Sequence, residues 1–126
     1  MWTEILCVGA GSCLGGIARY LSTLIIPSAG APDSFPWATF AVNVTGCFLL
    51  GLLFGLLDRG MSVPASVKLL LTVGFCGGFT TFSTFANESF LLLSSSQVLI
   101  GLLYAGLSVF AGIAAVYLGY LISSPV

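Results

Sequence analysis

The stretch GFCGGFTTFSTFANE, which runs from Gly74 to Glu88, lies inside a long apolar segment but is poorly suited to an ordinary membrane helix. Its glycines are weak helix formers, and its Thr and Ser residues bring hydroxyls to membrane depth. In a bilayer, irregular backbone occurs only where protein buries it or where it lines a cavity. A helix broken at Gly77-Gly78 and followed by hydroxyls is typical of an ion or substrate site. We therefore expect the functional centre in this stretch.

The composition places the whole chain in a membrane. Of its 126 residues, 58% are hydrophobic and 6% are charged, whereas a soluble domain carries about 25% charged residues. A chain with so few charges predicts an all-α integral membrane protein. It contains no histidine and no basic run that would indicate nucleic acid as a partner. Its four cysteines lie in apolar segments without a CxxC motif, which is typical of small buried side chains rather than metal ligands.

Four apolar segments predict four transmembrane helices in a single domain, residues 1–126. A spanning helix needs about 20 apolar residues, and such segments cover about residues 3–26, 36–57, 65–93 and 97–122. Pro27 would end the first helix, and a loop would follow from Ser28 to Pro36. The first segment has no positive leading region and is interrupted by Arg19, so we interpret it as an uncleaved helix rather than a signal peptide.

The third segment is too long for one straight helix. About 30 residues would extend about 45 Å, against a hydrocarbon core of about 30 Å. Tilt absorbs part of this excess, and a break at Gly77-Gly78 would absorb it as well. The break would leave backbone carbonyls without helical donors near the middle of the bilayer. Carbonyls of this kind hold Na⁺ in membrane proteins with broken helices.

A bundle of four short helices has little interior, so a pore would form more easily between subunits and we expect a dimer. Arg59 and Lys68 would lie on one side of the membrane, and Arg19 toward the other. This is a weak orientation signal. It is compatible with insertion both ways round and therefore with an antiparallel dimer.

Polar and aromatic side chains inside the helices outline a candidate route for an anion. Asn43 needs a hydrogen-bond partner in hydrocarbon, and its amide would either link two helices or donate to an anion. Phe82 and Phe85 share a helix face, where they would either pack as apolar side chains or present positive ring edges to an anion. Arg19 would either reach the nearby interface or form a positive vestibule.

Further hydroxyl, phenol and carboxyl groups are spaced to face the same route. They are Thr39 on the second helix, Thr80, Ser83, Thr84 and Glu88 on the third, and Tyr104 and Ser108 on the fourth. Any one hydroxyl could instead bond to the previous helical turn, and Glu88 would by default be exposed near the interface. No catalytic triad, Cys/His pair, phosphate loop or carboxylate pair is present, so we predict that the chain is not an enzyme.

The whole chain resembles the Fluc (CrcB) family of fluoride channels. The resemblance rests on GGIARY in the first helix, TFAVNVTG in the second and GFCGGFTTFSTF in the third. It implies a dual-topology antiparallel homodimer in the cell inner (plasma) membrane, with two fluoride pores and a central structural Na⁺. The implied function is passive export of toxic fluoride.

The resemblance also implies roles for single residues. Phe82 and Phe85 would be the pore aromatics, Asn43 a fluoride donor, and the Gly77 and Thr80 carbonyls the Na⁺ ligands. The implied polar track comprises Ser83, Thr84 and Tyr104, with Thr39, Glu88 and Ser108 as weaker transfers. We expect Arg19 and Glu88 to form the vestibule of the route. Fluoride is small and strongly hydrated, so it needs close donors once its water is removed, and amide, hydroxyl and ring-edge groups supply them.

Two other functions stay open from the sequence. A small multidrug transporter of dual topology would need a central acid on the first helix, where the only acid is Glu4 at its start. A non-transporting membrane scaffold would leave the glycine pair and the polar groups without a role. A flux assay distinguishes the three functions.

Overall fold

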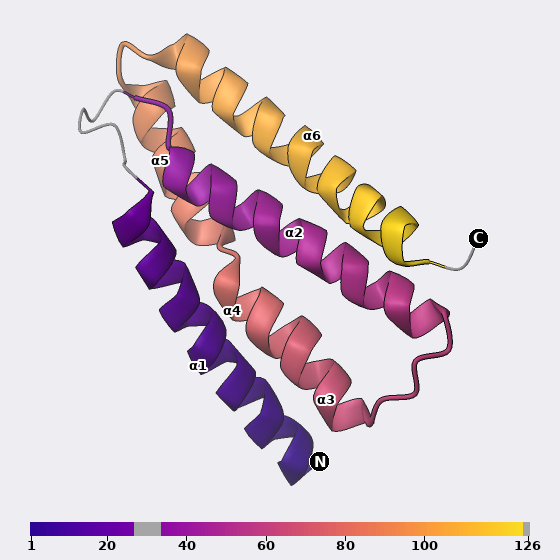
Figure 1. Ribbon diagram of the computed structural model, residues 1–126. Coiled ribbons are helices and arrows are strands. Elements are labelled where there is room, and N and C mark those ends of the chain that lie inside the picture. Colours follow the sequence, from indigo (N-terminus) through magenta and orange to yellow (C-terminus); the bar gives the residue numbers. More distant parts are fainter. Residues whose placement is uncertain (27–33, 125–126) are drawn as a thin grey trace.

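The chain folds into four long apolar helical segments that lie side by side (Figure 1). The computed structural model describes residues 1–26 and 34–124. Its elements are α1 (Trp2–Ile25), α2 (Trp37–Asp58), α3 (Ala65–Leu69), the π-helix η1 (Leu70–Cys76), α4 (Gly77–Phe79), α5 (Phe82–Ser94) and α6 (Val98–Ser123). All four segments, Ala65–Ser94 among them, are long and apolar enough to cross a membrane. The predicted fold class of an all-helical protein with four spans and a broken third segment is therefore confirmed.

Proline and glycine mark three of the helix ends that the structure describes. Pro36 directly precedes α2 and Pro64 directly precedes α3, where a missing backbone N–H costs nothing. Gly60 follows α2 with a φ of +87°, a left-handed conformation that only glycine adopts readily. Pro27 and residues 28–33 of the predicted loop lie outside the described residues.

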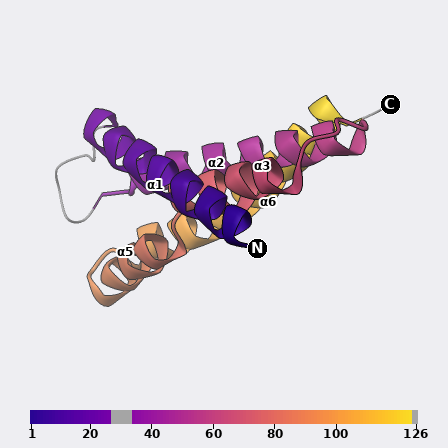
Figure 2. The ribbon, with the colours of Figure 1, turned by 90° about the horizontal axis from the view of Figure 1, so that it is seen from below.

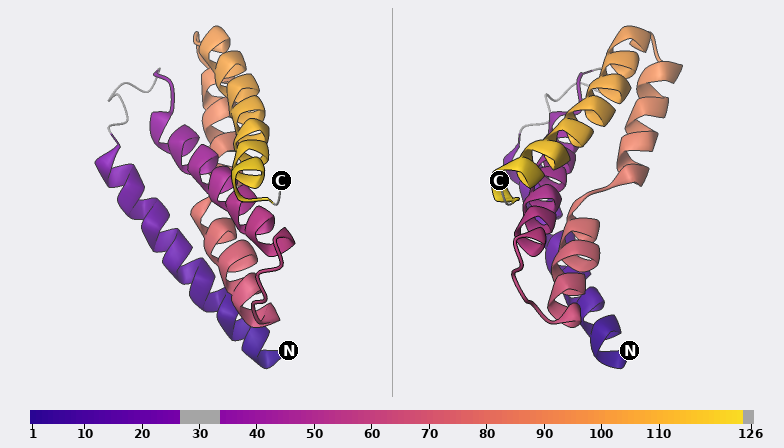
Figure 3. Two further views of the ribbon diagram at one scale, coloured as in Figure 1. Left: turned by 45° about the vertical axis from the view of Figure 1, so that its right-hand side comes forward. Right: turned by 90° about the vertical axis from the view of Figure 1, so that its right-hand side faces the viewer.

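The third segment breaks at Thr80 and Thr81, and the predicted break at Gly77-Gly78 is wrong by this short distance. Gly77 lies in α4 with helical angles, whereas Thr80 and Thr81 are both extended, with ψ of 158° and 116°. The right-hand view of Figure 3 shows α5 displaced sideways from α4 at this point. Gly78 allows α1 to pack closely against the third segment and does not bend it, because a Cβ there would lie 2.6 Å from the carbonyl oxygen of Ser12 on α1.

The break gives the two halves of the third segment different neighbours. Before it, α3, η1 and α4 pack against α1, and after it α5 packs against α6. Figure 2 shows α1 beside α3 while α5 diverges from α1 and lies with α6. Helix α2 contacts both halves, and it is therefore the element that can hold the break in place.

Glycines allow these helices to approach each other closely. Gly11 and Gly15 on α1 are buried against η1 and α4, and Gly51 on α2 is buried against α6. A Cβ on Gly15 would meet the carbonyl oxygen of Phe75 and lie 2.8 Å from the amide nitrogen of Phe79. Such backbone contact explains why small residues recur along the apolar helices.

Replacing Gly15 with alanine is expected to destabilise the protein by about 1–3 kcal/mol, because the added methyl group has to push α1 away from the backbone of the third segment. The neighbouring Gly16 has no atom within 4 Å of the position that an added methyl group would take, so Gly16→Ala is the matched control. Thermal unfolding of the detergent-solubilised protein measures both. Equal midpoints for the two variants would show that the α1 contact tolerates a side chain.

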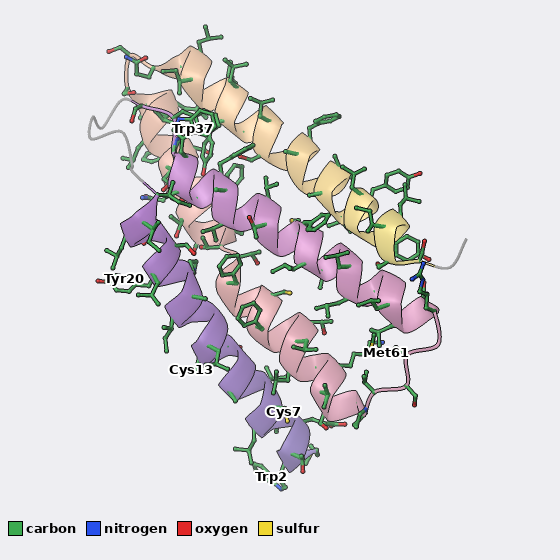
Figure 4. The ribbon with its side chains drawn as sticks, in the orientation of Figure 1. Trp2, Cys7, Cys13, Tyr20, Trp37 and Met61 are labelled. Carbon is green, nitrogen blue, oxygen red and sulfur yellow. The ribbon has the colours of Figure 1, made fainter. Side chains whose placement is uncertain are left out.

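The outer surface of the bundle is apolar, as a lipid environment requires. Trp2 and Tyr20 on α1 are 74% and 63% exposed, and Trp37 at the start of α2 is 53% exposed. Figure 4 shows Trp2 and Tyr20 on the outer side of α1, near its two ends. Aromatic side chains at helix ends are typical of the two membrane interfaces.

Candidate functional site

Asn43 holds the broken backbone from the side. Its Nδ2 donates to the carbonyl oxygen of Thr81 at 3.1 Å, and its Oδ1 accepts from the Thr81 amide at 2.8 Å. The side chain therefore replaces the backbone partners that Thr81 would have in a continuous helix. These two bonds support the first of the two interpretations of Asn43, in which its amide links two helices. An amide NH₂ group has two donors, so the second N–H remains for another acceptor.

Thr81 starts α5 as its N-cap. Its Oγ1 accepts from the Thr84 amide at 3.2 Å and lies 3.0 Å from the Thr84 hydroxyl and 3.4 Å from the Ser83 hydroxyl. A threonine in this position satisfies an amide that has no partner within the helix. The sequence interpretation placed Thr81 among the hydroxyls but missed this role. The available signal was a capping residue directly before a helical pattern.

These side-chain bonds free particular carbonyls of α4 and the break. In an α-helix the amide of residue i+4 donates to the carbonyl of residue i. The Thr81 amide donates to Asn43, so the Gly77 carbonyl loses its helical donor, and the Thr84 amide donates to Thr81 Oγ1, so the Thr80 carbonyl loses its donor too. The structure thus makes available the two carbonyls that the sequence resemblance pointed to.

Arg19 reaches the break from α1. Its Nε donates to the carbonyl oxygen of Gly78 at 3.2 Å, and the residue is half-buried. The structure therefore places Arg19 against the broken segment and not among the residues that line the cavity. Its guanidinium replaces the donor that Phe82 would supply to Gly78 in a continuous helix.

A cavity of about 350 Å³ lies beside the break, between α2, the third segment and α6. None of the residues that line it is charged. They are Asn43, Gly46, Cys47, Leu50, Thr72, Cys76, Gly77, Thr80, Thr81, Phe82, Phe85, Ser108, Val109 and Gly112. The lining is mostly apolar and carries a few neutral donors. This combination is typical of a site for a small ligand or ion.

The two predicted aromatics lie together at this cavity. The ring centroids of Phe82 and Phe85 are 5.7 Å apart, and the rings are tilted by 48°. Phe82 is 78% exposed, whereas Phe85 is half-buried and its ring lies 5.3 Å from that of Tyr104. Phe82 therefore lines the cavity, but the other residues of its own chain leave most of its side chain uncovered.

Glu88 is the centre of a separate hydrogen-bond network, and the expectation of an exposed carboxylate is wrong. Its Oε1 accepts from the Thr39 hydroxyl at 2.8 Å, and its Oε2 accepts from the Tyr104 hydroxyl at 2.7 Å. Thr39 is 4% exposed and Tyr104 is fully buried. Because both oxygens are hydrogen-bonded, the network links α2, α5 and α6 within the bundle.

The structure thus divides the predicted site residues into groups. Those at the cavity are Asn43, Phe82, Phe85 and Ser108, with Gly77 and Thr80. Thr39, Glu88 and Tyr104 form the neighbouring network, and the Phe85–Tyr104 ring contact joins it to the cavity. Ser83 and Thr84 lie in the first turn of α5 and do not line the cavity. The hydroxyl of Thr80 bonds back to the Cys76 carbonyl at 3.0 Å, as isolated helix hydroxyls usually do.

Comparison with known proteins gives the chain its family. Residues 6–120 match the model of the CrcB-like protein family, Camphor Resistance (CrcB). The chain is 46% identical to the fluoride-specific ion channel FluC of Flavobacterium psychrophilum, over 92% of this chain and 93% of that protein. It is 44% identical to the protein of the same name from Phocaeicola vulgatus, over 92% and 94% of the two chains. The chain is therefore a member of the CrcB-like family.

Proposed function

We propose that the chain is the subunit of a fluoride-selective channel that exports toxic fluoride passively across the cell inner membrane. The observation that carries this proposal is the uncharged cavity at the break, where a neutral amide, a hydroxyl and two phenyl rings meet. The relatives of this chain are named as fluoride-specific ion channels. A channel needs no catalytic groups, so the chain is not an enzyme.

The chemistry of the lining suits fluoride better than a larger anion. The second N–H of Asn43, the Ser108 hydroxyl and the positive ring edges of Phe82 and Phe85 can each donate to a dehydrated fluoride. A fixed positive charge in the cavity would hold the anion too firmly, whereas several neutral donors allow it to bind and to leave. Chloride is larger and would gain less from each of these contacts.

The functional unit in this proposal is an antiparallel homodimer with two pores. Phe82 and Gly77 are both exposed and both line the cavity, so we expect a second copy to cover this side of the bundle. A single chain leaves the cavity incomplete on this side, which supports a pore that is closed by the partner. The weak distribution of charge between the two sides supports insertion in both orientations.

A structural Na⁺ at the centre of this dimer would be held by the Gly77 and Thr80 carbonyls of both subunits. These two carbonyls have lost their helical donors, and oxygen ligands suit a hard cation. No carboxylate lines this part of the cavity. The residues present therefore fit Na⁺, which would join the two broken segments and balance their exposed carbonyls.

Efflux from proteoliposomes tests the function. Vesicles that contain the purified protein and are loaded with fluoride or chloride are diluted into buffer without that anion, and an ion-selective electrode follows the release. We expect rapid fluoride release and chloride release at the level of protein-free vesicles. Comparable release of both anions, or release of neither, would reject the proposed function. The same assay without Na⁺ tests the structural ion.

A further inference from the structure

Two buried hydroxyls in the described part of the chain have no hydrogen-bond partner, and they belong to Ser89 and Ser108. This is unusual in a helix, where a buried serine or threonine normally bonds back to the previous turn. Thr72 and Ser123 do so here, with the carbonyl oxygens of Lys68 and Gly119, each at 2.8 Å. A buried polar group without a partner costs about 1–3 kcal/mol. The two orphan hydroxyls therefore call for a ligand or a functional reason.

Ser108 already has a place in the candidate site because it lines the cavity. It follows Tyr104 by one turn of α6. Ser89 follows Phe85 by one turn of α5, and the rings of Phe85 and Tyr104 are in contact at 5.3 Å. Helices α5 and α6 run in opposite directions (Figure 1). The two orphan hydroxyls therefore lie on opposite sides of this ring pair, Ser108 on the cavity side and Ser89 toward the turn that joins α5 to α6.

Ser89 lies on the side of α5 that faces α6. It is 9% exposed, and Leu92, one turn further along, is 3% exposed and packs beside Gly101 of α6. The neighbouring Glu88 carboxylate accepts from Thr39 and Tyr104, and it takes no hydrogen bond from Ser89. The Ser89 hydroxyl thus keeps its proton free for an acceptor that enters between the helices.

We propose that the Ser89 hydroxyl is a further hydrogen-bond donor on the fluoride route, beyond the Phe85–Tyr104 contact. The inference rests on the proposed function and extends the route from the cavity toward the end of the bundle where α5 and α6 meet. Fluoride that passes the ring pair leaves the Ser108 donor and reaches the Ser89 donor. Hydrogen-bond donors on both sides of a narrow apolar contact shorten the distance over which the anion has neither water nor a protein donor.

Replacing Ser89 with alanine tests this proposal in the efflux assay. We expect fluoride release to fall by at least about fivefold, because a hydrogen bond to a charged partner is lost at this position. We expect the thermal midpoint to stay the same or to rise, because alanine also removes an unsatisfied polar group. Ser89→Thr keeps the hydroxyl and should restore most of the flux. Ser123→Ala is the matched control, because it removes a buried hydroxyl that is already bonded at the far end of α6.

Flux at the wild-type level in Ser89→Ala would overturn the proposal. So would a loss of flux that comes with a lowered midpoint or that threonine does not restore, because either result assigns Ser89 to packing. Fluoride release by the wild-type protein distinguishes failure of this inference from failure of the proposed channel function. If wild-type vesicles release no fluoride, the channel function itself fails, whereas active wild type with an indifferent Ser89→Ala rejects only the role of Ser89.

Discussion

Phe82→Ile is expected to abolish fluoride efflux from proteoliposomes while the protein stays folded. Isoleucine fills part of the volume of the phenyl ring but has no positive ring edge to offer an anion. The ring of Phe82 lines the cavity next to Phe85, with the centroids 5.7 Å apart, so its loss removes a donor directly at the break. Because the side chain is 78% exposed in its own chain, its truncation should cost little folding free energy.

Phe90→Ile is the control for this prediction. Phe90 lies on the same helix, is 65% exposed, and does not line the cavity. The two substitutions therefore remove the same ring from similar exposure, and only one of them removes it from the candidate pore. Size-exclusion chromatography checks that both variants keep the assembly state of the wild type. Wild-type flux in Phe82→Ile would place its ring against lipid and remove it from the pore.

The sequence predicted the four spans and the broken third segment because both follow from local properties. Long apolar runs specify spanning helices regardless of their neighbours. The excess length and the hydroxyls of Gly74–Glu88 were sufficient to indicate irregular backbone. The family is confirmed by the matches over nearly the whole chain. The antiparallel dimer, the Na⁺ site and the roles of the pore residues stay predictions.

The position of the break could not be predicted from local propensity, because contacts between distant segments set it. Gly77 and Gly78 tolerate helical geometry, and Gly78 is needed for the approach of Ser12 on α1. The helix ends where Asn43, which is 38 positions away in the sequence, takes the backbone partners of Thr81. A single sequence does not reveal this pairing. The same holds for Glu88, which we expected to be exposed near the membrane interface although its carboxylate accepts hydrogen bonds from Thr39 and Tyr104.

Asn43→Asp is expected to abolish fluoride efflux as well, for two reasons that act together. A carboxylate has no N–H, so it loses the bond to the Thr81 carbonyl and places two oxygens close to each other. It also adds a negative charge to an uncharged, mostly apolar cavity, where that charge repels an entering anion strongly. The first effect should destabilise the break by about 1–3 kcal/mol, and the second should close the route to fluoride.

Two further variants separate these effects. Asn43→Ala removes both hydrogen bonds to Thr81 without adding charge, so it should lower the thermal midpoint but retain more fluoride flux than Asn43→Asp. Asn87→Asp adds the same charge on α5 at an exposed residue that does not line the cavity. Its flux should stay near that of the wild type. If Asn43→Asp still conducts fluoride, the amide serves only to hold Thr81, and the anion passes the break without approaching α2.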